Sequence, residues 1–241
     1  MDEPLSNLDK NLRIQMRSTI REIQRDVGIT TIFVTHDQEE AMGMADRIAL
    51  MRDGRLEQVD TPTDLYARPN SAWAARFVGS SNILDATVER SDNTRTEVVL
   101  GGRSVRAPAS EAAVGEHVRL LMRPEALSVQ ATAGADLDAA NVFHGTVAEL
   151  TFLGPNVVYS VDIGLADSAP TPVTPASDEP APETEGSGTE AAEAGDVLVD
   201  DRQLIEVTDT FRGADALLEV GTPVQLAIDQ DRIVVAERGS S

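Results

Sequence analysis

Asp2 and Glu3, two adjacent carboxylates, and His36, a lone histidine that follows an apolar run, are the residues of this chain best suited to chemistry. A carboxylate at the end of a buried strand can hold Mg²⁺ through a water molecule, since Mg²⁺ keeps much of its hydration shell. A second carboxylate can accept a proton from an attacking water, and an imidazole can donate a hydrogen bond to an anionic oxygen. The same residue types also occur without any catalytic role: a lone histidine is usually a satisfied surface or core residue, and an Asp-Glu pair is usually a solvated turn.

The residues between these groups predict the elements that would position them. Apolar side chains recur at three- and four-residue steps, which predicts an amphipathic helix over residues 9–27, capped by Asp9 and ended by Gly28. Residues 30–34 are β-branched and mostly apolar, which is typical of a buried parallel strand, and residues 37–45 follow as a short helix. The arginines of the long helix lie on a different face from its apolar residues: Arg13, Arg17, Arg21 and Arg25.

The rest of the chain divides into a short helical part and a part rich in strands. Asp53-Gly54 predicts a hairpin between residues 47–51 and 55–59, and Thr61-Pro62 caps a helix. Gly79-Ser80-Ser81 is the first credible domain boundary. Beyond it, short alternating runs predict a small β-barrel or sandwich. These runs are Ile83–Glu89, Glu97–Leu100, Arg103–Ala107, His117–Met122, Phe143–Phe152, Val157–Ile163, Leu204–Thr208, Val224–Ile228 and Ile233–Ala236.

Composition excludes several classes of protein. The 241 residues include no cysteine, so a disulfide framework and a thiolate metal site are excluded. The formal net charge of −21, with 28 acidic and 10 basic residues in 79–241, argues against binding to nucleic acid. One lysine against nineteen arginines suggests a salt-rich cytoplasm, or else an acidic tail combined with arginine-rich codon usage.

Residues 166–196 combine low hydrophobicity with repeated Ala, Pro, Thr and Glu, which predicts a disordered insertion. The chain shows no signal peptide and no apolar run of 18 residues, so an intracellular protein is the default.

Five blocks of residues 1–84 together resemble the ATPase subunits of ABC importers, in the segment from the Walker B strand through the D-loop to the switch histidine. Any one block would be weak, but their joint order and spacing are specific. The blocks are Met1–Asp9, Val34–Met42, Ala45–Ile48, Met51–Gln58 and Thr61–Tyr66.

The resemblance implies a function and a role for each residue of the candidate site. Asp2 would hold Mg²⁺ through a water, Glu3 would act as the general base, and His36 would bind the γ-phosphate of ATP. Asp9, with Ser6 and Asn7, would form the loop that crosses to the second subunit of a homodimer. The family also pairs with membrane-spanning permease subunits on the inner face of the cell membrane.

The chain departs from the family because its sequence contains no G-x-x-x-x-G-K-[ST] phosphate loop and no Leu-Ser-Gly-Gly-Gln signature. We therefore expect a truncated P-loop NTPase segment, cut just before its carboxylates, that is inactive alone. Met1 then reads as an internal methionine or a fragment boundary. The expected fold is α/β in this segment and all-β afterwards.

The strand-rich half resembles the OB-like accessory barrel of such importers, the TOBE domain. The resemblance rests on Leu121–Leu127, with its Arg-Pro-Glu block, and on Phe152–Gly154 followed by Val157–Val161. Arg123 and Glu125 could bind an anion or another subunit, but a structural salt bridge that locks the barrel turn is the preferred interpretation.

These patterns lead to one preferred hypothesis and two alternatives. Residues 1–79 are expected to be the C-terminal part of an ABC ATPase domain and residues 80–241 a TOBE-like barrel. The subunit would couple MgATP hydrolysis to import of a solute, and residues 77–84 look closer to the polyamine, iron and anion branch than to the sugar branch. A non-enzymatic module that binds a small ligand and a non-functional remnant are the other two hypotheses.

Overall fold

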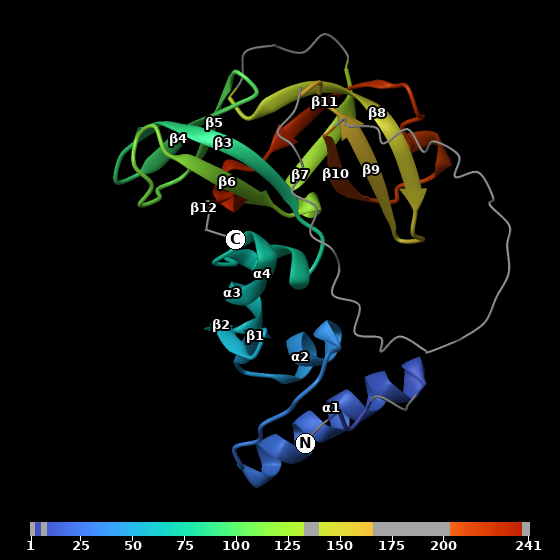
Figure 1. Cartoon of the computed structure of the whole chain (residues 1–241). Helices are drawn as coiled ribbons and strands as arrows, with labels where there is room; N and C mark the ends of the chain where they lie inside the picture. Colours follow the sequence, from blue (N-terminus) through green and yellow to red (C-terminus); the bar gives the residue numbers. More distant parts are fainter. Residues whose placement is uncertain (1–2, 6–8, 133–139, 166–202, 238–241) are drawn as a thin grey trace, which may run out of the picture.

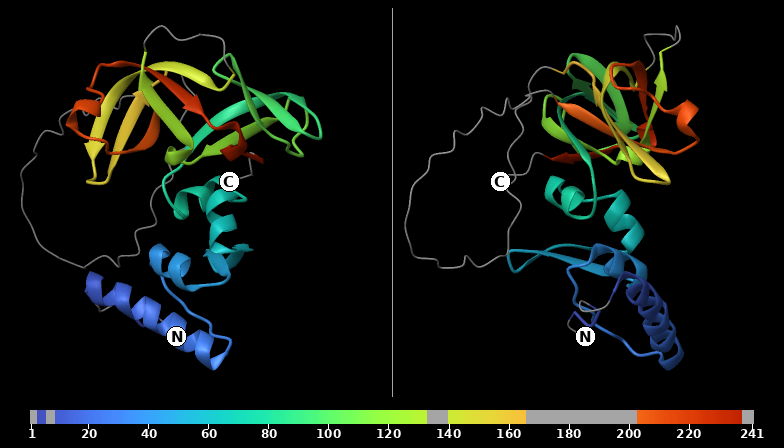
Figure 2. Two further views of the ribbon diagram at one scale, coloured as in Figure 1. Left: turned by 180° about the vertical axis from the view of Figure 1, so that it is seen from behind. Right: turned by 90° about the vertical axis from the view of Figure 1, so that its right-hand side faces the viewer.

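The structure is a computed structural model that describes residues 3–5, 9–132, 140–165 and 203–237. The insertion predicted at 166–196 lies outside the described residues. In the described part of the chain, helices α1 to α4 and the β1–β2 hairpin occupy one end of the molecule, and two five-stranded β-sheets occupy the other (Figures 1 and 2). Helix α1 lies farthest from the sheets, and α4 lies directly against them (Figure 1).

Helix α1 (Lys10–Val27) begins and ends where the sequence predicts. The Asp9 carboxylate accepts the backbone N–H groups of Asn11 and Leu12, each at 3.0 Å, and so satisfies two of the free donors at the helix start. Gly28 ends the helix with φ 67°, a left-handed conformation that glycine adopts without a steric penalty. Local sequence is therefore sufficient to set both ends of α1.

The apolar face of α1 and the run that follows it are not buried in the described structure. Leu12 is 40% exposed and Val27 61% exposed. The prediction of a buried strand at residues 30–34 is wrong, because this run is extended without a sheet and only Val34 forms an isolated bridge. A parallel strand needs hydrogen-bonded neighbours on both sides, and the described residues around this run supply no sheet for it.

The segment between α1 and the sheets follows the predicted order. Helix α2 (Gln38–Met44) is followed by the hairpin of β1 (Ile48–Arg52) and β2 (Arg55–Asp60), then by α3 (Pro62–Ala67) and α4 (Ala72–Phe77). Asp53 and Gly54 turn the hairpin with φ 49° and 73°, as a type I′ turn requires. A small core joins these elements, made of Leu50, Leu65, Ala74 and Val78.

The strand-rich half consists of two five-stranded antiparallel sheets, which confirms the predicted mostly-β architecture. One sheet has the order β10-β9-β8-β11-β7 and the other the order β12-β6-β3-β4-β5. The strands of the first are β7 (Leu127–Ala131), β8 (Val142–Phe152), β9 (Asn156–Asp162), β10 (Leu204–Thr210) and β11 (Pro223–Ile228). Those of the second are β3 (Asn82–Ser91), β4 (Arg95–Leu100), β5 (Arg103–Pro108), β6 (His117–Met122) and β12 (Val234–Glu237).

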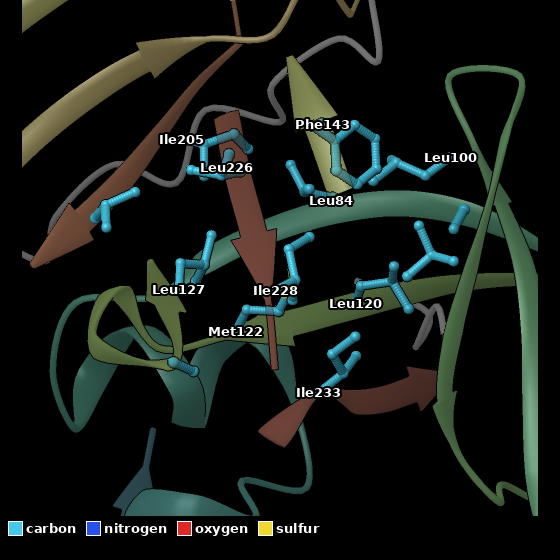
Figure 3. Packing of buried hydrophobic residues seen from close by; sticks show 14 of the residues in the cluster. Leu84, Leu100, Leu120, Met122, Leu127, Phe143, Ile205, Leu226, Ile228 and Ile233 are labelled. Atoms are coloured by element: carbon cyan, nitrogen blue, oxygen red, sulfur yellow. The ribbon is translucent and has the colours of Figure 1, made fainter. Parts of the chain in front are cut away.

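The two sheets enclose one hydrophobic core, shown in Figure 3. Leu84 and Leu120 enter it from one sheet, and Phe143 and Leu226 enter it from the other. Alternating residues are buried in β3 and β11, so in these strands the period-two pattern read from the sequence corresponds to the inner face of the sheet. The core is built almost entirely from aliphatic side chains, as the aromatic content of 3% requires.

Arg123 joins the sheets to the helical part, and its partners correct the predicted salt bridge with Glu125. Its guanidinium is buried and donates hydrogen bonds to the backbone oxygens of Tyr66, Ala75, Gly79 and Ser80 at 2.8 to 3.1 Å. The Glu125 carboxylate instead lies 3.8 Å from Arg232 and accepts the Tyr66 hydroxyl at 2.8 Å. The role of Arg123 is structural, as the sequence suggested. Its guanidinium, however, donates hydrogen bonds to carbonyl groups and not to the Glu125 carboxylate.

Candidate functional site

Glu3 and His36 lie in direct contact although 32 residues separate them in the chain. The Glu3 Oε1 atom is 2.7 Å from Nδ1 of His36, and the backbone N–H of Glu3 donates to the carbonyl of Val34 at 2.9 Å. The second contact places residue 3 beside the extended run that leads to His36. The two side chains predicted as base and phosphate ligand therefore converge on one place.

The Glu3 carboxylate changes the acid–base behaviour of His36. Its hydrogen bond and its negative charge raise the pKa of His36 above the ordinary value of 6.5, with smaller contributions from Asp37 and Glu40. The His36 side chain is 75% exposed, so its other ring nitrogen is accessible to a ligand. A histidine of this kind can donate a hydrogen bond to an anion while its other nitrogen is held by a carboxylate.

Asp37 anchors the start of α2 directly after His36. Its Oδ1 atom accepts the N–H of Glu40 at 3.1 Å as an N-cap, and its Oδ2 atom accepts Arg13 and Arg17, each at 3.1 Å. Partial burial opposes ionisation of Asp37, but the amides of Glu40 and Glu39 and the two guanidiniums outweigh it and lower the pKa of Asp37. The loop that carries His36 is thus fixed by a charged cap at pH 7.

Three arginines of α1, spaced four residues apart, bind α2 and hold it in place. Arg13 and Arg17 approach Glu40, which is 2% exposed, at 3.6 and 3.8 Å, and Thr35 donates to the same carboxylate at 2.8 Å. Arg21 binds the carbonyl of Met44 one helical turn further on. Residues four apart lie on one face of a helix, so Arg13 and Arg17 share the start of α2 and Arg21 reaches its last residue.

The surface between α1 and α2 contains a hollow of about 420 Å³ beside His36. Its lining combines arginine, carboxylate, imidazole and amide groups, and it contains Arg13, Ile14, Arg17, His36, Asp37, Gln38 and Glu39. Sequence reasoning placed the arginines on a face away from the apolar stripe but assigned them no role. Their four-residue spacing opposite the acidic start of α2 was the signal that could have indicated this contact.

The structure brings together only part of the predicted site. Asp9 is described, and its carboxylate is engaged as the cap of α1. Asp2, Ser6 and Asn7 lie outside the described residues. Within the described ranges no group of three or more His, Asp and Glu side chains is arranged to hold a metal ion. In the same part of the chain, none of the helices combines the length and apolar character of a membrane span.

Comparison with known proteins identifies the relatives of this chain. The TOBE domain family matches residues 120–185, from β6 onward. A spermidine/putrescine import ATP-binding protein, PotA 2, of Pseudomonas aeruginosa is 44% identical over 165 residues, which are 68% of this chain and 45% of that protein. The chain is homologous to the ATP-binding subunits of ABC importers. This finding confirms the resemblance read from the sequence.

Other ABC importer ATP-binding subunits match over a similar length. The ferric iron import protein FbpC of Brucella melitensis is 39% identical over 162 residues, 67% of this chain and 44% of that protein. PotA of Rubrobacter xylanophilus is 44% identical over 163 residues, 66% of this chain and 42% of that protein. The chain thus spans about 45% or less of the length of the curated relatives it matches.

A solved structure of the cytoplasmic molybdate-binding protein ModG also aligns with this chain. The TM-score is 0.45 at 14% identity, and the alignment covers 65% of this chain and 95% of ModG. Similarity at this level carries no conclusion about ligand or mechanism. The assignment to ABC importer subunits depends on the sequence relatives and the TOBE domain match alone.

Proposed function

We propose that this chain is the C-terminal part of an importer ATP-binding subunit and that Glu3 and His36 form one wall of its ATP hydrolysis site. The contact between Glu3 Oε1 and His36 Nδ1 at 2.7 Å carries this proposal. Two residues that belong to widely separated motifs meet in space, and they are the two that the resemblance assigns to the reacting phosphate. The homology to ABC importer ATP-binding subunits supports the same assignment.

The roles of the individual residues follow from their chemistry. Glu3 is the proton acceptor toward a water molecule, and the protonated His36 donates from its exposed nitrogen to a phosphate oxygen. Asp2 is proposed to hold Mg²⁺ through a water, and Mg²⁺ would supply charge neutralisation on the phosphates. Asp9, Ser6 and Asn7 are proposed to form the loop that meets the second subunit.

The residues of this chain fit only part of a MgATP site. The sequence contains no glycine-rich phosphate loop, and its one lysine, Lys10, is the first residue of α1. The exposed apolar face of α1 and the exposed Val34 are surfaces that a larger domain would cover. We therefore propose that this chain alone does not hydrolyse ATP and that a further segment, of the length its relatives have, completes the site.

The proposed setting is that of an importer subunit. The chain would form a homodimer of ATPase subunits, bind membrane-spanning permease subunits and lie on the inner face of the membrane, without binding nucleic acid. Its acidic surface, with nineteen arginines and one lysine, is proposed to suit a salt-rich cytoplasm. The solute is proposed to belong to the polyamine or ferric iron class, because PotA 2 is a spermidine/putrescine import protein and FbpC a ferric iron import protein.

A complementation assay tests the proposed function. The chain is co-expressed with the segment of Pseudomonas aeruginosa PotA 2 that precedes the shared region, and MgATP hydrolysis is measured for the chain alone and for the purified assembly. We expect hydrolysis from the assembly, its loss on Glu3→Gln and its retention on the matched change Glu22→Gln, on an exposed residue of α1 outside the hollow. An assembly that forms but does not hydrolyse ATP contradicts the ATPase role, and turnover by the chain alone that Glu3→Gln abolishes contradicts the proposed incompleteness. Binding of a small ligand without nucleotide would instead favour the non-enzymatic module.

A further inference from the structure

The loop that carries His36 is tied to α4 by one side chain. Gln38, two residues after His36 and the first residue of α2, donates a hydrogen bond from Nε2 to the carbonyl oxygen of Phe77. Phe77 is the last residue of α4 and lies 39 positions further along the chain. A movement of the His36 loop therefore acts directly on the C-terminal end of α4.

Helix α4 is in turn fixed to the β half of the molecule. Nη1 of Arg123 donates to the carbonyl oxygens of Ala75 at 2.8 Å and Gly79 at 3.1 Å, so it holds the last turn of α4 and the residues after it. Ala75, Leu121 and Ala236 form a separate buried cluster between α4 and the sheet. The single Arg123 guanidinium also lies over the Tyr66 ring, 4.1 Å from its centroid.

We propose that α4 couples the β half to His36, with Gln38 and Arg123 as the positioning residues at its two contacts. The Gln38 amide binds the carbonyl of Phe77 at the end of α4, and the Arg123 guanidinium binds the carbonyls of Ala75 and Gly79 around the same turn. A six-residue helix that is held by a side chain from each part of the molecule can transmit a displacement from one contact to the other. The consequence for regulation of ATP hydrolysis rests on the proposed function, whereas the coupling itself does not.

The chain contains its own reporter for this coupling. Trp73, its single tryptophan, lies in α4 and stacks on Phe77 with ring centroids 5.0 Å apart and an interplanar angle of 24°. The guanidinium of Arg52 lies 5.4 Å from the centroid of the Trp73 ring. Because Phe77 carries both the stacked ring and the carbonyl that Gln38 binds, Trp73 emission reports the state of this contact.

The protonation state of His36 is the change that Trp73 is proposed to report. The groups that raise its pKa are Glu3, Asp37 and Glu40, and the cations Arg13 and Arg17 line the same hollow from α1. Deprotonation of His36 weakens its contact with Glu3, and in this proposal the residues between His36 and Gln38 then shift while the Asp37 cap stays in place. We expect a step in Trp73 emission as the pH rises through the pKa of His36, with a midpoint equal to that of the His36 imidazole resonance measured by NMR.

Paired variants of the 241-residue protein test the proposal without any nucleotide. His36→Gln should abolish the emission step. Gln38→Leu should abolish it while His36 still titrates, and the matched Gln24→Leu, which removes another glutamine-to-carbonyl bond at 2.8 Å, should retain it. An emission step that persists in Gln38→Leu would show direct quenching of Trp73 and would overturn the coupling.

The other contact is tested from the β half. Arg123→Lys keeps the charge but cannot reach all of its carbonyl partners, so it should shift the His36 resonance at fixed pH. The matched change, Arg119→Lys on strand β6 just before Arg123, alters an ion pair with Asp85 at 3.5 Å and should leave that resonance in place. A folded Arg123→Lys protein with an unchanged His36 resonance would contradict the proposal. Should Arg123→Lys fail to fold, the Gln38→Leu measurement still decides it.

Discussion

Different forces stabilise the two ends of the molecule. In the β half, leucines such as Leu120 and Leu226 are fully buried in one core shared by two sheets. At the other end, α1 leaves much of its apolar face exposed and contacts α2 through arginine–carboxylate pairs. Hydrophobic burial contributes roughly 25 cal/mol per Å², whereas ion pairs at or near the surface contribute about 0 to 1 kcal/mol each. The β half is thus a stable unit, and α1 depends on weaker, salt-sensitive contacts.

Removing the same side chain from both ends gives the largest contrast. Leu226→Ala should lower the free energy of unfolding by about 3 kcal/mol, because a fully buried leucine leaves a cavity. Leu12→Ala on α1 removes a side chain that is 40% exposed and should cost less than about 1 kcal/mol. Urea unfolding followed by circular dichroism measures both. Equal losses would show that α1 is packed as tightly as the sheets.

The junction should be the next most sensitive place. Gly79 has φ 145°, and a Cβ added there would lie 3.3 Å from Cε2 of Tyr66 and 3.5 Å from Nη1 of Arg123. Gly79→Ala should therefore cost about 2 kcal/mol, through backbone strain and displacement of the Arg123 contacts. Gly102→Ala has a similar strained backbone at φ 78° but open space for the Cβ, so it should cost less. If the two variants unfold at the same midpoint, the junction is no more sensitive to an added Cβ than an open turn.

A smaller effect is expected at the start of α1. Asp9→Ala removes the acceptor of two backbone N–H groups and should destabilise the helix by about 1 kcal/mol. Ser18→Ala, in the exposed middle of the same helix, is the control and should be neutral or slightly stabilising. Amide hydrogen exchange at Asn11 and Leu12 reports the change directly. Unaltered exchange in Asp9→Ala would mean that contacts with α2, rather than the cap, determine the order of the first turn.

The smallest effect on stability should come from the contact between Glu3 and His36, which is exposed. The pKa of His36 is raised in the folded protein, so this contact stabilises the fold fully below pH 6.5 and the contribution disappears as the pH rises through the folded pKa. Glu3→Gln should lower the pKa of His36, measured by NMR titration of the imidazole. Glu39→Gln, on a carboxylate that pairs with Arg17 at 3.4 Å, should leave that pKa where it is. If the pKa of His36 does not change in Glu3→Gln, the contact between Glu3 and His36 does not form in solution.

Most of the fold could be predicted from local patterns, and the misses have a common cause. Nine strands of the β half were predicted within two residues at each end, but β7 (Leu127–Ala131) was not predicted. It is a short run after a Pro-Glu-Ala turn, and its partner β11 follows almost a hundred residues later. The strand expected at residues 30–34 fails in the opposite sense, because its composition suits a sheet that the described residues do not supply. In both cases a distant partner decides the outcome.

The candidate site shows the same division. The sequence by itself determined the caps at Asp9, Asp37 and Thr61, the turn at Asp53-Gly54 and the alternation of the strands, because each depends on interactions within a few residues. Only the tertiary structure decided that Glu3 meets His36, that Arg13 and Arg17 hold the start of α2, and that Arg123 binds carbonyls rather than Glu125. These contacts join segments 20 to 57 positions apart. At such separations the packing of whole helices and sheets decides which polar groups lie near a given side chain. A local pattern of residue types does not contain this information.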